Sequence, residues 1–206
     1  MKHYLIGSLA MAAVVVASNI LVQYPIGQWL TWGAFSYPLA FLVSDLINRF
    51  HGPAAARRVV YAGLAVGLLC SFIGTQINGE FGPLVTMRVA IGSGLAFLVG
   101  QLLDITLFDR LRRTAWWRAP FLSTLLGSTA DTAIFFTVAF SAALVWIEPG
   151  NDVSWATAPV AMLGVGPVVP LWVSLGAADF CVKLAVDALA LLPFRLAIAK
   201  YAARIA

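Results

Sequence analysis

Residues 88–131 read RVAIGSGLAFLVGQLLDITLFDRLRRTAWWRAPFLSTLLGSTAD, and this stretch decides the fold. It consists of two apolar runs joined by a short loop rich in arginine. The polar residues inside the apolar runs include Arg88, Gln101, Asp104 and Asp131. A charged side chain at the centre of a bilayer costs roughly 2.5–3.5 kcal/mol on insertion scales. We therefore expect these side chains to face other helices or a polar pathway rather than lipid.

The composition of the whole chain indicates a membrane protein. Of its 206 residues, 61% are hydrophobic and 11% are charged, whereas soluble domains average about 25% charged residues. We interpret the net charge of +4 as a property of cytoplasmic loops and not as a sign of nucleic-acid binding, because no basic residues line an exposed polar face. The bilayer is therefore the expected surrounding medium.

Six apolar segments are long enough to cross a bilayer, which takes about 20 helical residues. They are residues 4–22, 30–47, 59–77, 84–108, 120–146 and 171–193. We expect Pro38 to kink the second segment, the Arg57–Arg58 pair to lie in a loop, and residues 159–170, rich in Gly and Pro, to be irregular. The predicted fold class is all-α: a polytopic membrane protein of six transmembrane helices in a single domain, residues 1–206.

The distribution of basic residues predicts the orientation. With a cytoplasmic N-terminus, 11 of the 13 Lys and Arg residues fall in cytoplasmic segments. The outer loops then contain acidic residues and no Lys or Arg. Positively charged loops remain on the cytoplasmic side of a membrane. We therefore expect both termini to be cytoplasmic. The inner basic residues are Lys2, Arg49, Arg57, Arg58, Arg110, Arg112, Arg113, Arg118, Arg195, Lys200 and Arg204, and the outer acids are Glu80, Glu148 and Asp152.

Two opposite charges are predicted at the same depth. At a rise of about 1.5 Å per residue, Asp131 lies roughly 16 Å into its segment, and Lys183 lies equally deep in the last segment. Asp179, Lys183 and Asp187 also share one helix face, so the two acids could neutralise the lysine. Such a triad could serve only to hold helices together. For Asp131 and Lys183 we favour a binding site, because transporters bind substrates near the midplane.

The other polar residues inside the segments have two interpretations each. Gln101 and Asp104 share a face in the inner third of their helix. Arg88, near the outer end, could extend to the interface. Asp45 could form an interfacial cap or a gating ion pair beside Arg49, and Asn19 could hydrogen-bond within the helix packing.

No catalytic or cofactor chemistry is evident. The sequence has no nucleophile–base arrangement, no phosphate loop and no metal-ligand spacing. Cys70 and Cys181 lie in apolar runs, and we expect both to be free thiols. We predict no enzyme activity, no cofactor and no metal.

Several pieces, in order along the chain, resemble a known family. They are Ser18–Gln23, Thr31–Pro38 with Asp45–Leu46, Ala56–Arg58, Arg88–Asp104, Arg110–Arg112, Trp116–Pro120, Ser123–Leu125, Asp131–Thr132 and Asp179–Cys181 with Lys183. Together they are similar to the queuosine precursor transporters, also called the vitamin uptake transporter family. Nearly the whole chain takes part in this resemblance, except the segment 147–170.

The resemblance implies a six-span importer in the bacterial inner membrane. Its substrate would be 7-cyano-7-deazaguanine or a related planar 7-deazapurine, salvaged to make queuosine in transfer RNA. A carboxylate such as Asp131 can accept the adjacent N–H and amino groups of a guanine-like edge. The other candidate substrate-binding residues are Gln101, Lys183, Asn19, Arg88, Trp32, Phe35 and Tyr37, and the candidate gating or structural charges are Asp45, Asp104, Asp179 and Asp187.

The mode of transport stays open. A facilitator, a proton-coupled importer and a substrate-binding subunit docked onto an ATPase module all fit the sequence. Glycine-rich spans permit a homodimer. The expected partners are the small deazapurine and the lipid bilayer, with an ATPase module under the third alternative only.

Overall fold

The computed structural model describes residues 2–80 and 82–202, and within them the chain is mostly helical. The predicted all-α class is confirmed. Short hairpins and 3-10 turns connect the helices. The helices are α1 (Lys2–Leu21), α2 (Gly33–Ser36), α3 (Leu39–His51), α4 (Pro53–Gln76), α5 (Met87–Leu111), α6 (Arg118–Phe140) and α7 (Leu171–Ala202). The hairpins are β1–β2 (Pro25–Ile26, Leu30–Thr31), β3–β4 (Asn78–Gly79, Gly82–Pro83) and β5–β6 (Pro159–Ala161, Val168–Pro170), and the 3-10 turns are η1 (Ala142–Ile147), η2 (Ser154–Thr157) and η3 (Met162–Gly164).

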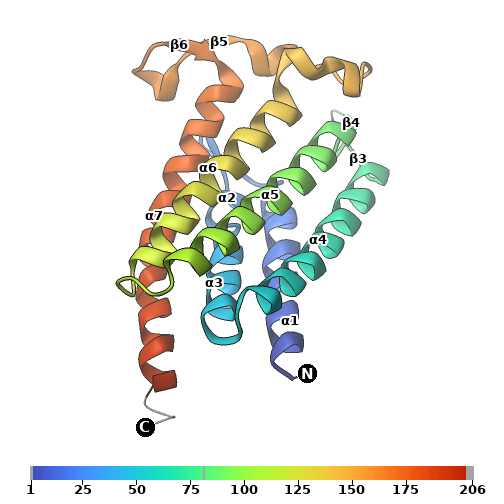
Figure 1. Ribbon diagram of the computed structural model, residues 1–206. Helices are drawn as coiled ribbons and strands as arrows, with labels where there is room; N and C mark the ends of the chain where they lie inside the picture. Colours follow the sequence, from blue (N-terminus) through green and yellow to red (C-terminus); the bar gives the residue numbers. More distant parts are fainter. Residues whose placement is uncertain (1, 81, 203–206) are drawn as a thin grey trace.

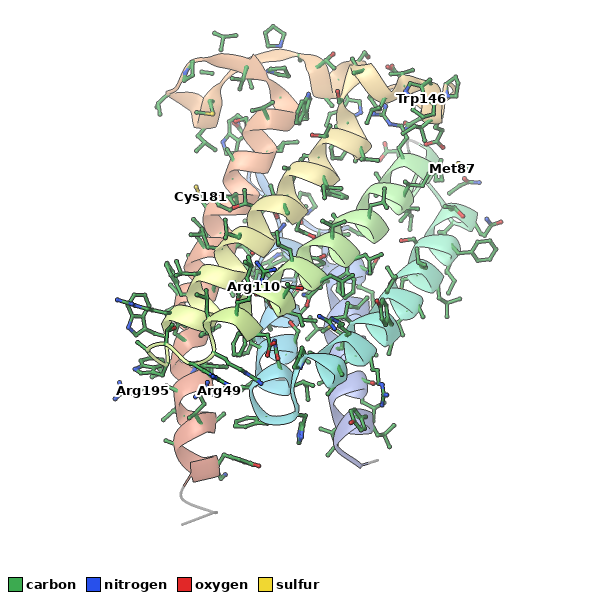
Figure 2. The ribbon with its side chains drawn as sticks, viewed as in Figure 1. Arg49, Met87, Arg110, Trp146, Cys181 and Arg195 are labelled. Carbon is green, nitrogen blue, oxygen red and sulfur yellow. The ribbon has the colours of Figure 1, made fainter. Side chains whose placement is uncertain are left out.

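The long helices form a bundle with distinct ends. Both chain ends lie at one end of the bundle, together with the α3–α4 and α5–α6 connections (Figure 1). The hairpins β3–β4 and β5–β6 lie at the opposite end. Figure 2 shows Arg49 and Arg195 near the first end, and Met87 and Trp146 near the second. The basic connections therefore gather at the end that holds the termini.

Within residues 2–80 and 82–202, four helices are long and apolar enough to cross a membrane: α1 from Tyr4, α4, α5 and α6. Two further predicted spans have other forms. Helix α7 has the length, at 32 residues, but Asp179, Lys183 and Asp187 interrupt its apolar character. The segment predicted at 30–47 is divided between α2 and α3.

The second predicted span is the largest departure from expectation. Leu30 and Thr31 pair with the preceding strand in a hairpin, so helix begins only at Gly33. The interruption predicted at Pro38 is confirmed, because this residue separates α2 from α3. Proline has no amide hydrogen and so cannot continue the helical hydrogen-bond pattern. The break leaves Tyr37 between two helices.

Three boundaries also differ from expectation. The predicted loop at Arg57–Arg58 is the start of α4, which begins with Pro53, a residue favoured at the first helical position. Helix α6 ends at Phe140, before the predicted 146, and α7 continues through Pro193. The irregular segment around 159–170 is confirmed as β5, η3 and β6.

The closest helix crossing joins α5 and α6. A Cβ added at Gly100 would lie 3.0 Å from the carbonyl oxygen of Gly127 and 2.9 Å from Asp131 Cβ, and a Cβ added at Gly127 would lie 2.9 Å from the oxygen of Gly100. Both contacts involve backbone, which cannot move aside as a flexible side chain can. These two glycines therefore let α5 approach Asp131 closely.

Candidate functional site

A charged network joins α6 and α7 in the interior of the bundle. Lys183 Nζ lies 2.7 Å from Asp131 Oδ2 and 2.6 Å from Asp179 Oδ2. Lys183 and Asp131 are 4% and 2% exposed, so water screens their attraction little. The predicted Asp131–Lys183 pair is therefore confirmed as a contact. Its role in binding stays a prediction.

Two hydroxyl groups complete this network. The Tyr37 hydroxyl donates to Asp131 Oδ1 at 2.9 Å, and the Tyr37 ring centroid lies 5.2 Å from Lys183 Nζ. Lys183 also donates to Thr132 Oγ1 at 3.0 Å, and Thr132 donates to Asp179 Oδ2 at 3.2 Å. Each acid therefore has partners on more than one helix, which fixes the orientation of its oxygens.

Gln101 is fully buried on α5, and neither its amide nitrogen nor its amide oxygen has a hydrogen-bond partner among the described residues. The preceding residue, Gly100, contacts Asp131. One turn away, Phe97 packs edge-on against Tyr37, with ring centroids 6.3 Å apart. Buried polar groups are nearly always hydrogen-bonded, and leaving one unpaired costs about 1–3 kcal/mol. Gln101 therefore presents unused donors and acceptors beside the charged network.

Two further acids lie toward the end of the bundle that holds the termini. Asp45 and Asp104 are 3% and 0% exposed. Thr124 Oγ1 on α6 lies 3.4 Å from Asp45 Oδ2 and 3.1 Å from Asp104 Oδ1. The suggested ion pair of Asp45 with Arg49 is wrong, because Arg49 donates to the carbonyl oxygen of Arg112 instead. Asp45 faces the interior.

The expected neutralisation of Lys183 by both acids of its helix is only half right. Asp179 pairs with the lysine, but Asp187 accepts a hydrogen bond from Ser128 at 3.2 Å. Over the described part of the chain, the ion pairs of Lys183 are those with Asp131 and Asp179. The network around Lys183 therefore faces α6 and not the next turn of α7.

Arg88, the second residue of α5, is 0% exposed and packs inside the protein. Its guanidinium donates from Nε to the Val138 carbonyl at 3.0 Å and from NH2 to the Ser141 carbonyl at 2.6 Å. These are carbonyls at the end of α6, whose groups lack helical partners. Val138 is seven residues beyond Asp131, about 10 Å along the helix. The structure thus gives Arg88 a capping position away from Asp131.

The remaining candidates lie outside the network. Asn19 donates to the Val15 carbonyl one turn earlier in its own helix, at 2.9 Å. Trp32 and Phe35 are 54% and 42% exposed and contact each other, with ring centroids 6.1 Å apart. Of the predicted aromatic residues, only Tyr37 reaches the charged network.

Comparison with known proteins identifies the family. The sequence model described as "Putative vitamin uptake transporter" matches residues 31–198. The chain belongs to the vitamin uptake transporter family. The resemblance found in the sequence is thereby confirmed.

Individual members of this transporter family support the assignment. The chain is 35% identical over 200 residues to the queuosine precursor transporter of Escherichia coli, covering 90% of this chain and 81% of that protein. It is 29% identical over 186 residues to the probable queuosine precursor transporter of Bacillus subtilis, covering 80% and 70% respectively. No solved structure matches.

Three hydroxyl side chains of α6 in this transporter were not among the residues predicted for the site. Thr132 binds Lys183, Thr124 contacts two acids, and Ser128 binds Asp187. With Asp131 they occupy positions 124, 128, 131 and 132, a helical spacing that places them on one side of α6. This spacing is visible in the sequence and could have predicted that one side of α6 is polar.

Proposed function

We propose that this transporter imports 7-cyano-7-deazaguanine, or a related planar 7-deazapurine, across the bacterial inner membrane for queuosine salvage. The relatives are named queuosine precursor transporters, which supports the substrate class. The observation that carries the proposal is Gln101, a buried residue next to Gly100 of the Asp131 contact, whose amide has no hydrogen-bond partner among the described residues.

The chemistry of the network suits the edge of a deazaguanine. Asp131 Oδ1 and Oδ2 each accept one hydrogen bond, from Tyr37 and Lys183, and a carboxylate oxygen has two acceptor sites. Asp131 can therefore accept the ring N–H and the exocyclic amino group while it keeps its protein partners. The Gln101 amide supplies the donor that the ring carbonyl requires. Tyr37 and Phe97 provide aromatic surface for the ring.

The proposed topology has six spans with both termini in the cytoplasm. Helices α2 and α3 together act as the second span, and α7 tolerates three charges because its network faces α6. The termini and the basic connections share one end of the bundle, which supports a cytoplasmic position for that end under the positive-inside rule.

The test is uptake in bacteria that lack both queuosine precursor synthesis and their own importer. Expression of this protein with external 7-cyano-7-deazaguanine should restore queuosine in transfer RNA, and Asp131→Ala should abolish the rescue. Asp109→Ala is the control, because this half-buried acid at the end of α5 pairs with Arg112 and lies outside the Lys183 network. Failure of a correctly inserted wild-type protein to rescue would refute the substrate. Co-purification of this protein with ATPase subunits, together with uptake that requires those subunits, would favour the alternative of a substrate-binding subunit.

A further inference from the structure

The pair of carboxyl groups formed by Asp45 on α3 and Asp104 on α5 has no role in the substrate site described above. We infer that this pair binds a proton and that the proton moves inward together with the substrate. The inference rests on the proposed function and adds its energy source.

The two acids of the pair lack a cationic partner. Among the described residues, no lysine or arginine forms an ion pair with Asp45 or Asp104, whereas Asp131 and Asp179 share Lys183. Two ionised carboxylates side by side in a dry interior repel each other, and neither is solvated. A single proton held between them removes the repulsion and leaves one charge.

The hydroxyl of Thr124 has too few hydrogen atoms to serve both acids. Thr124 Oγ1 lies within hydrogen-bonding distance of both acids, but its hydroxyl carries only one hydrogen. Thr124 can donate to one carboxylate only. The other contact becomes a hydrogen bond when the carboxyl group itself carries a proton and donates to the threonine oxygen.

Several buried side-chain oxygens around the pair can accept further hydrogen bonds. Asp45 Oδ1, Asp104 Oδ2 and Asn48 Oδ1 have no partner among the described residues, and all three side chains are at least nine-tenths buried. Asn48 reaches α5 next to Asp104, donating to the Ile105 carbonyl at 3.1 Å. These oxygens can accept from a water molecule or a hydronium ion that carries the proton.

A small cavity lies beside Asp45. It has about 10 Å³ open to the centre of a water molecule, which is room for roughly one water. Its lining includes Asp45, Thr124 and Asp187, so a third acid faces it from α7. The polar groups that the other contacts place near the pair are Asn48 on α3 and Asp187 on α7, while the nearby Arg49 and Arg112 bind backbone carbonyls.

Gln101 links the proton to the substrate. It precedes Asp104 by three residues on α5, so the two side chains share a helix face. A substrate that binds Gln101 and a proton that binds Asp104 therefore act on neighbouring turns of one helix. Protonation occurs from outer water, the carboxyl O–H bond breaks on release, and the proton passes to water on the cytoplasmic side.

The experiment uses the full-length protein in liposomes with labelled 7-cyano-7-deazaguanine. Two rates are measured: exchange of label without a gradient, and accumulation when the lumen is one pH unit more alkaline. A coupling of one proton per substrate permits up to about tenfold accumulation per pH unit. Asp45→Asn and Asp104→Asn, which mimic the protonated acid, should still exchange label but lose accumulation, while Asp109→Asn should accumulate as the wild type does.

The outcomes separate the two proposals. Wild-type exchange that ignores the pH gradient would overturn proton coupling and leave the proposed function intact. Gradient-driven accumulation by both Asp45→Asn and Asp104→Asn would overturn the assignment to this pair. Absence of any exchange by the wild type would overturn both proposals. If a variant fails to fold, the gradient dependence of the wild type still decides on coupling.

Discussion

At the scale of single residues, Lys183 is the centre of the buried charges. It contacts two acids and a threonine hydroxyl at 2.6–3.0 Å and lies over the ring of Tyr37. Removing one member of a buried ion pair leaves an uncompensated charge and costs about 3–5 kcal/mol. The network therefore stabilises this arrangement of α6 and α7 only while all its members are present.

Lys183→Met should lower the stability of the purified protein by about 3–5 kcal/mol, seen as a lower melting temperature in detergent. Lys200→Met, an exposed lysine on the same helix, should leave the melting temperature unchanged. Adding Asp131→Asn and Asp179→Asn to Lys183→Met should recover much of the loss, because no charge is then left unpaired. A Lys183→Met protein that melts like the wild type would contradict the buried network.

The sequence predicted the depth of the polar residues along their helices well, but it did not predict how each helix is rotated about its axis. The rise per residue placed Asp131 opposite Lys183, and the structure confirms that contact. The partners of Asp45 and Arg88 depend on how neighbouring helices turn about their axes and on where α6 ends, which local patterns do not determine. Stacking of Tyr37 on a substrate stays a prediction, whereas the hydrogen bond from its hydroxyl to Asp131 could not be read from the sequence, because it depends on the break at Pro38.

At the scale of helices, the crossing of α5 and α6 positions the site. Gly100 and Gly127 place backbone against backbone, and the same contact holds Asp131 beside α5. The site therefore depends on a helix–helix distance as well as on its polar side chains.

Gly100→Ala and Gly127→Ala should each destabilise the protein by roughly 1–3 kcal/mol and weaken deazapurine binding, because the added methyl group meets backbone. Gly67→Ala is the matched control. Its added Cβ would lie 3.4 Å from a Val15 methyl group, an ordinary contact. Melting temperature and binding affinity of the three variants check the prediction, and equal behaviour of all three would argue against a site set by this crossing.

At the scale of the whole molecule, the bundle has one basic end and one end built of short hairpins. The segment η1–β6 covers the second end, where Glu148 accepts hydrogen bonds from the backbone N–H groups of Met87 and Arg88. The backbone N–H of Ser154 donates to Asp152 and lowers the pKa of that carboxyl. An ionised Asp152 fits an outer surface.

Single cysteines test this orientation. In a protein lacking Cys70 and Cys181, Gly150→Cys should react with a membrane-impermeant maleimide on spheroplasts, because residue 150 is exposed and follows Glu148, which binds the first N–H groups of α5. Thr114→Cys, in the α5–α6 connection, should react only after the membrane is permeabilised. The reverse pattern would place the termini outside.

The most direct test of the substrate site is Gln101→Met, measured by calorimetric binding of 7-cyano-7-deazaguanine to the purified protein. Because the Gln101 amide has no hydrogen-bond partner in the described part of the chain, its loss should leave the melting temperature equal to that of the wild type or higher. Loss of its hydrogen bonds to the substrate should weaken binding about tenfold or more. The same substitution at Gln76, exposed at the end of α4, should change neither quantity. Wild-type affinity in Gln101→Met would contradict the substrate site proposed beside Asp131.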